Sequence, residues 1–302
     1  MTASKSNIRM ETAPDGARLR IGHWQTGVRP VGTVILVHGR TEFLEKYAEV
    51  TAELNHRGLD AWAMDWRGQG LSDRFLNHSQ KGHIDRFDTY IDDLVWFAND
   101  IIDPRAGPVV VLAHSMGGHI AVRAILEGAL KPKGLIATAP MIALPMTRLG
   151  ALGAGLLSRV VSGAGFGERY GPGMADYDSA RVRFEDNPLT GDRDRFDRIH
   201  VLLADNPDFA LGGVTWGWLN AAFRSMAEIR RLSRGVSGMC PARICTPMDD
   251  RVVSVDAQTR LCNTVGGWEQ IRFEDARHEL LMEIDDIRNR FWSAFDGFLR
   301  TL

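Results

Sequence analysis

The chain has 302 residues, of which 44% are hydrophobic and 25% are charged. This composition is typical of a folded globular protein and excludes a disordered or fibrous one. Its 36 lysines and arginines nearly balance 38 aspartates and glutamates, so no basic excess indicates a nucleic-acid partner. The three cysteines form no CxxC pair, and the first residues contain no apolar segment of a signal peptide. We therefore expect a reduced, cytoplasmic protein without a cysteine-rich metal site.

In the first half of the chain, short apolar runs alternate with apolar residues at helical spacing. Strands are predicted at residues 33–37, 59–64, 108–112 and 134–139. A helix is predicted after each of the first three strands, and the last of these begins near Ser115 and continues to about Leu130. Continuous β-branched runs separated by helices favour a mostly parallel sheet with helices on both faces. The predicted fold class is therefore α/β.

This alternation stops after Pro140. Residues 150–173 contain eight glycines in 24 residues, and polar, arginine-rich helical sequence follows. A structureless loop of that length is uncommon in a compact domain, so we predict an inserted helical subdomain at residues 142–238. The core is then 1–141 and 239–302. Its second part has predicted strands at 242–246 and 270–273, a helix at 255–264, and a final helix with one apolar face, formed by Ile284, Ile287, Phe291, Phe295 and Phe298.

The most membrane-like stretch is 151–166, inside the predicted insert. It carries Arg159 and several glycines, and we expect it to be too short to span a bilayer about 30 Å thick. Peripheral contact with the inner face of a membrane remains open, as does packing of this stretch on the core.

The strongest chemical motif is Ala113-His114-Ser115-Met116-Gly117-Gly118, which lies between a predicted strand and a predicted helix. A nucleophilic serine on such a tight turn needs very small neighbours, and the helix N-terminus offers NH groups to a developing oxyanion. Ala113 stands where glycine is usual, so we expect a slightly crowded turn. The alternative is that Ser115 only caps the helix.

A serine nucleophile needs a histidine base, and in this arrangement the histidine follows in the chain. Three histidines come after Ser115. His119 lies one helical turn into the elbow helix, and His200 lies in the insert. His278 follows the last predicted strand and precedes the final helix, where a base at the sheet edge belongs.

The histidine in turn needs an acid to orient it. Asp249 and Asp250 both follow the predicted strand 242–246. We favour Asp250, because it directly precedes the next element, and keep Asp249 as the alternative. Asp275 is a further candidate, but it is too close in sequence to His278 for the usual bond between loops.

An oxyanion hole needs two NH donors. The first expected donor is the backbone NH of Met116, which follows the nucleophile. The second is the backbone NH of Arg40, in the loop after strand 33–37, where Gly39 permits close approach. We expect His38, in the same loop, to be structural. The Arg40 side chain is also a candidate contact for a substrate phosphate.

Taken together, these residues resemble the α/β-hydrolase superfamily, and within it the bacterial lysophospholipase and monoacylglycerol lipase branch. The resemblance implies that Ser115, Asp250 and His278 form a catalytic triad, with the NH groups of Arg40 and Met116 as oxyanion donors. It also implies an α/β-hydrolase fold whose insert is a lid over an acyl pocket. The matching blocks are HGRTEFLEKY (38–47), DWRGQGLSD (65–73), GHIDRFDTYIDDL (82–94), LAHSMGG (112–118), TAPM (138–141), NPLTGD (187–192), DDRVV (249–253) and RHELLME (277–283).

The expected activity is hydrolysis of the acyl ester of a lysophospholipid or monoacylglycerol, with no metal or organic cofactor. Met141 and Trp216 are candidate substrate contacts, although buried tryptophans more often serve packing. A short-chain esterase, a thioesterase or an aminopeptidase of the same fold is the alternative. An aminopeptidase would need an acidic clamp, for which the insert offers Glu168, Asp176, Asp178, Glu185 and Asp186. A non-catalytic binding protein of this fold is the third hypothesis.

Overall fold

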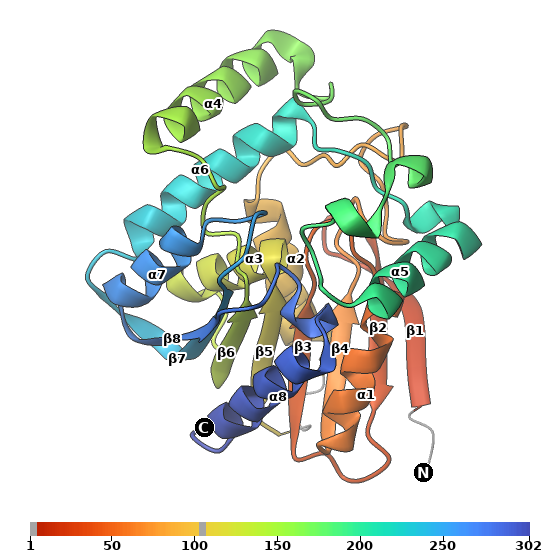
Figure 1. Cartoon of the computed structure of the whole chain (residues 1–302), viewed down its shortest axis with the longest axis vertical. Coiled ribbons are helices and arrows are strands. Elements are labelled where there is room, and N and C mark those ends of the chain that lie inside the picture. Colours follow the sequence, from red (N-terminus) through yellow and green to blue (C-terminus); the bar gives the residue numbers. More distant parts are fainter. Residues whose placement is uncertain (1–4, 103–106) are drawn as a thin grey trace.

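The computed structural model describes residues 5–102 and 107–302, and its central feature is one mixed sheet (Figure 1). Within these residues the sheet has eight strands in the order β1-β2-β4-β3-β5-β6-β7-β8. β2 is antiparallel to both β1 and β4, and all other neighbours are parallel. The strands are β1 (Lys5–Thr12), β2 (Arg18–Gln25), β3 (Gly32–Val37), β4 (Leu59–Met64), β5 (Val109–His114), β6 (Gly134–Thr138), β7 (Val236–Pro247) and β8 (Val265–Phe273).

Helices cover both faces of the sheet, because the central strands are apolar on both sides. Ile35 and Val37 of β3 pack into one core with α2, α3 and α7, whereas Val34 and Leu36 pack into a second core with α1 and α8. This alternation follows from successive strand residues pointing to opposite faces. The covering helices are α1 (Ala48–His56), α2 (Asp88–Trp96), α3 (Ser115–Leu126), α7 (Val255–Thr264) and α8 (Asp285–Leu299).

The predicted α/β fold is confirmed, with differences at the ends of several elements. α3 ends at Leu126 rather than near Leu130, and Gly128 follows with a φ of 72°. β7 begins at Val236, so it already includes the predicted end of the insert at Gly238. The placement of Ile284 on the buried face of the last helix was wrong. It precedes α8 and is 43% exposed, because the helix begins only at Asp285.

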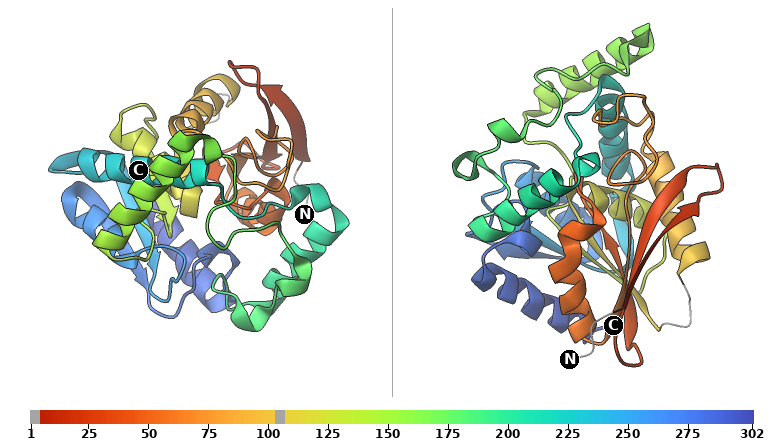
Figure 2. Two further views of the ribbon diagram at one scale, coloured as in Figure 1. Left: turned by 90° about the horizontal axis from the view of Figure 1, so that it is seen from above. Right: turned by 90° about the vertical axis from the view of Figure 1, so that its right-hand side faces the viewer.

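Between β6 and β7 the chain forms a helical segment, residues 142–235, which we call the cap. Its helices are α4 (Arg148–Val161), α5 (Arg193–Asp205) and α6 (Trp216–Leu232), and both Figure 1 and Figure 2 show them gathered at one end of the sheet. α6 joins the cap to the core, since Trp218, Ala222 and Met226 are buried in the same cluster as α2 and α3. A backbone hydrogen bond of 3.0 Å from Gly82 to Gly213 adds a second attachment.

α4 is longer than the sequence suggested. Together with a final turn it runs from Arg148 to Phe166, 19 residues, which by length and composition alone is enough to cross a membrane. The expectation that this stretch is too short was therefore wrong, because the helix starts three residues before the apolar run. Only 6% of its apolar window is buried in the protein. Leu149, Leu152 and Leu156 are 80%, 59% and 65% exposed.

Candidate active site

Ser115 lies on the sharp turn between β5 and α3, with a φ of 51°. Such a left-handed conformation is rare for a residue other than glycine and marks local strain. The next residues must be small: a Cβ on Gly117 would lie 2.4 Å from the carbonyl oxygens of Val37 and His38. The methyl of Ala113 is accommodated without loss of the turn, because Ala113 is still part of strand β5 and pairs with β3 and β6.

The sequence-predicted base and acid come together on this serine. His278 Nε2 lies 2.9 Å from Ser115 Oγ, and His278 Nδ1 lies 2.7 Å from Asp250 Oδ2. The other oxygen of Asp250 accepts the backbone NH groups of Val252 and Val253 at 2.8 and 3.0 Å. The Asp250 carboxylate is therefore held in one orientation, and it holds the His278 ring toward the serine.

The other candidate bases and acids lie elsewhere. His119 Nδ1 is 2.9 Å from the carbonyl of Met141, and its Nε2 is 2.6 Å from Ser225 Oγ, behind the elbow. His200 contacts the hydroxyl of Tyr177 in the cap at 2.9 Å. Asp249 is exposed and pairs with Arg251 at 3.2 Å, and Asp275 is also exposed. The geometry therefore favours Asp250 and His278.

The loop after β3 lies directly against the start of α3. Its His38 side chain is bonded within the loop, with Nδ1 2.8 Å from the Gly39 carbonyl, and Trp66 Nε1 donates to the His38 carbonyl at 2.8 Å. The Gly39 NH donates to the carboxylate of Glu42. Gly117 lies against the carbonyl oxygens of Val37 and His38, so the beginning of this loop packs directly on the elbow.

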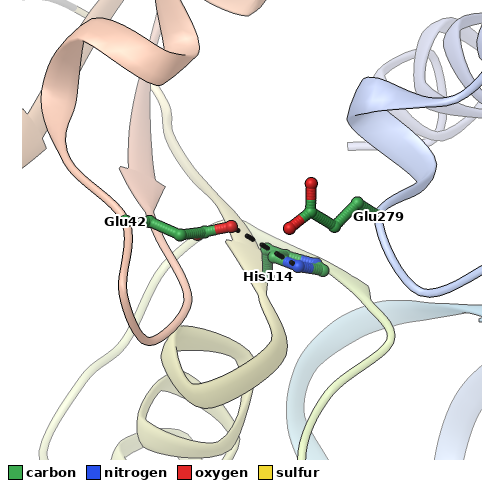
Figure 3. Close-up of side chains that lie close together, drawn as sticks. All are labelled: Glu42, His114 and Glu279. Atoms are coloured by element: carbon green, nitrogen blue, oxygen red, sulfur yellow. Dashed lines mark ion pairs between the residues drawn. The ribbon is translucent and has the colours of Figure 1, made fainter. Parts of the chain in front are cut away.

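A buried ionic cluster lies beneath this loop, and the sequence analysis did not find it. Figure 3 shows Glu42, His114 and Glu279 converging, and their nearest ligand atoms all lie within 4.8 Å of one another. The cation between the carboxylates is the ammonium group of Lys46, 2.6 Å from Glu42 and 2.7 Å from Glu279. Tyr47 donates its hydroxyl to Glu42 at 2.7 Å. Lysine thus supplies the positive charge that a metal would otherwise bring to this set of ligands.

The charges in this cluster fix the protonation of its members. Burial alone would raise the pKa of Glu42, but Lys46 foremost holds it well below its usual range. Burial alone would lower the pKa of Lys46, and the two carboxylates outweigh that effect and raise it. Burial lowers the pKa of His114 to about 3, so His114 stays neutral beside His278, whose ring centroid is 4.9 Å away.

The members of this cluster are close in sequence to the triad residues and to the loop after β3. Glu279 follows His278 in the chain, His114 precedes Ser115, and Glu42 accepts the NH of Gly39. Glu42 and Glu279 belong to the matching blocks HGRTEFLEKY and RHELLME, so their position beside the site residues is the sequence signal for the cluster.

The two candidate substrate contacts lie in different elements, Met141 shortly after β6 and Trp216 in the cap. The backbone NH of Met141 donates to the carbonyl of Ser115 at 3.0 Å, so its side chain begins next to the nucleophile. Trp216 is the first residue of α6, and its NH donates to the carbonyl of Arg169 at 3.0 Å. Trp218 is buried against Phe87 and serves packing. A cavity of about 310 Å³ lies in the cap away from the nucleophile, lined by Tyr177, Phe184, Arg193, Phe196 and His200 among others.

The comparisons with known proteins agree with this geometry. The family described as serine aminopeptidase, S33, matches residues 28–285. Lysophospholipase L2 of Escherichia coli K12 is 29% identical over 266 residues, which cover 85% of this chain and 76% of that protein. Monoglyceride lipase of Rattus norvegicus is 29% identical over 129 residues, 42% of this chain and 41% of that protein.

Solved structures show the same fold. A soluble variant of monoglyceride lipase from Saccharomyces cerevisiae superposes with a TM-score of 0.76 at 20% identity, covering 99% of this chain and 96% of that one. The predicted resemblance to the lysophospholipase and monoacylglycerol lipase branch is therefore confirmed. With the family match extending over most of its length, this chain belongs to the serine aminopeptidase S33 family of α/β-hydrolases.

Proposed function

We propose that this protein is a serine hydrolase that cleaves the acyl ester of lysophospholipids or monoacylglycerols. The observation that carries the proposal is the chain of hydrogen bonds from Ser115 through His278 to Asp250, on a strained turn between a strand and a helix. The names of the relatives, lysophospholipase L2 and monoglyceride lipase, support the substrate class.

In this proposal the triad acts through an acyl-enzyme. His278 accepts the Ser115 proton as Oγ attacks the ester carbonyl, and Asp250 stabilises the imidazolium that forms. His278 then protonates the leaving glycerol oxygen and later activates the water that releases the fatty acid. The backbone NH groups of Arg40 and Met116 stabilise the oxyanion, each contributing about 3–4 kcal/mol.

We further propose that the insert, residues 142–238, is a lid over an acyl-binding site, next to the core of 1–141 and 239–302. Contacts between cap and reaction centre support it: Glu279 donates its NH to the Leu189 carbonyl at 2.8 Å, and His278 donates its NH to the Pro188 carbonyl at 3.4 Å. Met141 and Trp216 are the proposed substrate contacts. Each CH₂ of an acyl chain buried there is worth about 0.8 kcal/mol, so an apolar site both binds and selects lipid.

The exposed face of α4 supports peripheral contact with a membrane surface. Its apolar residues face solvent, while Gly155 packs against Phe223 of α6, which ties the helix to the cap. An amphipathic helix held in this way lies in the plane of the interface. We propose that α4 rests on the inner face of the membrane, with the protein otherwise in the cytoplasm, and delivers lipid to the site.

An aminopeptidase is the second candidate, because the description of the matching family favours it. The carboxylates available for a clamp argue against it. Asp176 accepts the Tyr170 hydroxyl, Asp178 pairs with Arg181, and Glu185 pairs with Arg193. These are solvated pairs within the cap and do not surround the nucleophile.

The test is hydrolysis of a matched substrate set by the wild type, by Ser115→Ala and by Ser179→Ala. The set contains a lysophospholipid and a monoacylglycerol with the same acyl chain, a short nitrophenyl ester and an aminoacyl nitroanilide. We expect lipid turnover that Ser115→Ala abolishes and that Ser179→Ala, an exposed serine in the cap, retains. Turnover of the nitroanilide alone would favour the aminopeptidase, and turnover of the short ester alone would refute the lipid assignment.

A further inference from the structure

The Arg40 side chain is a charged group that no step of the proposed mechanism uses. It projects from the loop that carries the proposed oxyanion donor, and it is half-buried. Its Nη1 donates to the carbonyl of Gly212, at the base of the cap, at 2.9 Å. The same atom lies 3.5 Å from the position that a Cβ on Gly82 would occupy. The guanidinium therefore lies at the junction between the core and the cap.

This guanidinium has no anionic partner among residues 5–102 and 107–302, the part of the chain that the structure describes. The buried Arg67 and Arg123 there are paired with Asp93 and Asp88. The half-buried Arg74 and Arg277 bond only carbonyl oxygens, but three and two of them, whereas Arg40 bonds one. Burial lowers the pKa of Arg40 to about 10, and the one ionisable neighbour that opposes this effect is the hydroxyl of Tyr90. Arg40 thus remains cationic at neutral pH, in an environment that disfavours an unpaired charge.

A guanidinium carries five N–H donors in a planar fork, and the bond to Gly212 uses one of them. A single carbonyl does not require this group, since a neutral amide donor satisfies it without the cost of a desolvated charge. The fork matches the geometry of a phosphate or carboxylate. The guanidinium is therefore suited to an anion, and a phosphate on the substrate of the proposed reaction would supply one.

We propose that the Arg40 side chain forms an anion subsite for the phosphate of the substrate head group, so that the enzyme prefers lysophospholipids to neutral monoacylglycerols. This inference rests on the proposed function, because it places the head group relative to the scissile ester. The covalent geometry is suitable. In a 1-acyl lysophospholipid, as many bonds separate the ester carbonyl carbon from the phosphorus as separate the Arg40 amide nitrogen from its guanidinium carbon. With the backbone NH on the oxyanion, the side chain reaches as far as the phosphate does.

The experiment compares the wild type with Arg40→Gln and Arg40→Lys on 1-acyl lysophosphatidylcholine and on the monoacylglycerol with the same acyl chain. Both variants keep the backbone NH, and only lysine keeps the charge. The glutamine side chain is two bonds shorter and loses the contact with Gly212, so the melting temperature of each variant is measured as well. For Arg40→Gln we expect kcat/KM on the lysophospholipid to fall about 10- to 100-fold, mainly through KM. Turnover of the glyceride should fall far less, and Arg40→Lys should recover part of the selectivity.

Inhibition of glyceride hydrolysis by head-group analogues is the second measurement. Glycerophosphocholine should inhibit the wild type competitively and Arg40→Gln more weakly. Inhibition by inorganic phosphate with none by the phosphodiester would overturn the lysophospholipid assignment and leave a general anion site. Equal losses of activity on both lipids, together with a lowered melting temperature, would show that Arg40 only attaches the cap to the core. This result would also overturn the proposed anion subsite.

The two proposals fail in different ways. If the wild type hydrolyses neither lipid, or if Ser115→Ala keeps the activity, the proposed function itself is wrong. If both lipids are hydrolysed in a Ser115-dependent manner and Arg40→Gln leaves their ratio unchanged, only the anion subsite is wrong.

Discussion

The carboxyl edge of the sheet and helix α4 of the cap are built in opposite ways. At the sheet edge, Ser115, His278 and Glu42 are at most 8% exposed and are joined by hydrogen bonds through several strands and loops. Along α4, large apolar residues face solvent, and the helix is attached mainly through its contact with α6. Polar groups are buried at the proposed reaction centre, where catalysis requires exact geometry, and apolar groups are exposed on the helix that we propose contacts a lipid surface.

From this contrast we infer that the sheet edge carries out the reaction and that α4 controls how membrane-bound substrates reach it. Substitutions at the sheet edge should then lower turnover of every substrate, including a small soluble ester. Substitutions on the exposed face of α4 should affect only substrates presented in a membrane. The predictions below test this separation, from the largest expected effect to the smallest.

The largest effect is expected for Asp250→Asn. The amide cannot stabilise the imidazolium and favours the wrong tautomer of His278, so kcat on a short nitrophenyl ester should fall by about 10⁴-fold. Asp249→Asn is the matched control, since its exposed side chain bonds only Arg251 among the described residues. A comparable loss in Asp249→Asn would show that the acid has been assigned to the wrong neighbour.

Glu42→Gln should have the next largest effect. It removes one of the two carboxylates that hold Lys46, inside the protein, and weakens the acceptor for the Gly39 NH. Breaking a buried pair costs about 3–5 kcal/mol in the free energy of unfolding, which urea denaturation measures. We also expect slower turnover of soluble and lipid esters alike.

The control for Glu42→Gln is Glu53→Gln, which removes a partly exposed partner of Arg57. Exposed pairs contribute at most about 1 kcal/mol. If both variants lose the same small amount of stability, the cluster under the oxyanion loop is not an important support of the site.

The sequence predicted the apolar parts of the fold well and the polar parts less well. The strands β3 and β4 are continuous apolar runs, and their predicted bounds are within one residue of those observed. β1 and β2 were missed because polar residues interrupt both sequences, KSNIRMET and RLRIGHWQ, which leaves no apolar run. β7 and β8 were predicted too short for the same reason, since glycine and polar residues interrupt their first parts.

The site was predictable where chain order constrains it. Ser115, Asp250 and His278 follow from an elbow motif and from the order of residues at strand ends, and the structure brings them together. The link between Lys46 and Glu279 joins positions 233 residues apart, and neither residue type indicates the contact locally. Such a contact can be identified only from the three-dimensional structure, in which the two loops come together.

The double substitution Leu152→Gln and Leu156→Gln tests the access region. Both side chains are more than half exposed, so the fold should tolerate the change. Loss of their burial in the interface should reduce binding to phospholipid vesicles about tenfold, with hydrolysis of a soluble ester retained. Val201→Gln, an exposed apolar residue of α5, is the control. Equal losses in the control would show that general cap hydrophobicity, and not α4, mediates binding.

The smallest effect on stability is expected at the ion pairs that attach α5, the other end of the cap, to the core. Arg195 of α5 bonds Glu49 of α1, which also pairs with Arg288 of α8. The hydrogen bond from Arg195 is the largest cause that lowers the pKa of Glu49 from its ordinary value near 4.5 to about 2; burial opposes it, and the charges of Arg288 and Arg195 lower the pKa further. A carboxylate with a lowered pKa in the folded state stabilises the protein above the unfolded pKa, and this contribution is lost as the pH falls toward 2.

Glu49→Gln should therefore lower the melting temperature at pH 7 by about 1–3 °C, because the pair is partly exposed and screened by solvent. The difference from the wild type should shrink as the pH falls from 4.5 toward 2, and it should vanish only below pH 2, where Glu49 is neutral in the folded protein too. An undiminished difference below pH 2 would mean that Glu49 acts through packing. In the predicted case, α5 is an anchored end of the cap held by charge, while α4 remains the end that is free to meet a lipid surface.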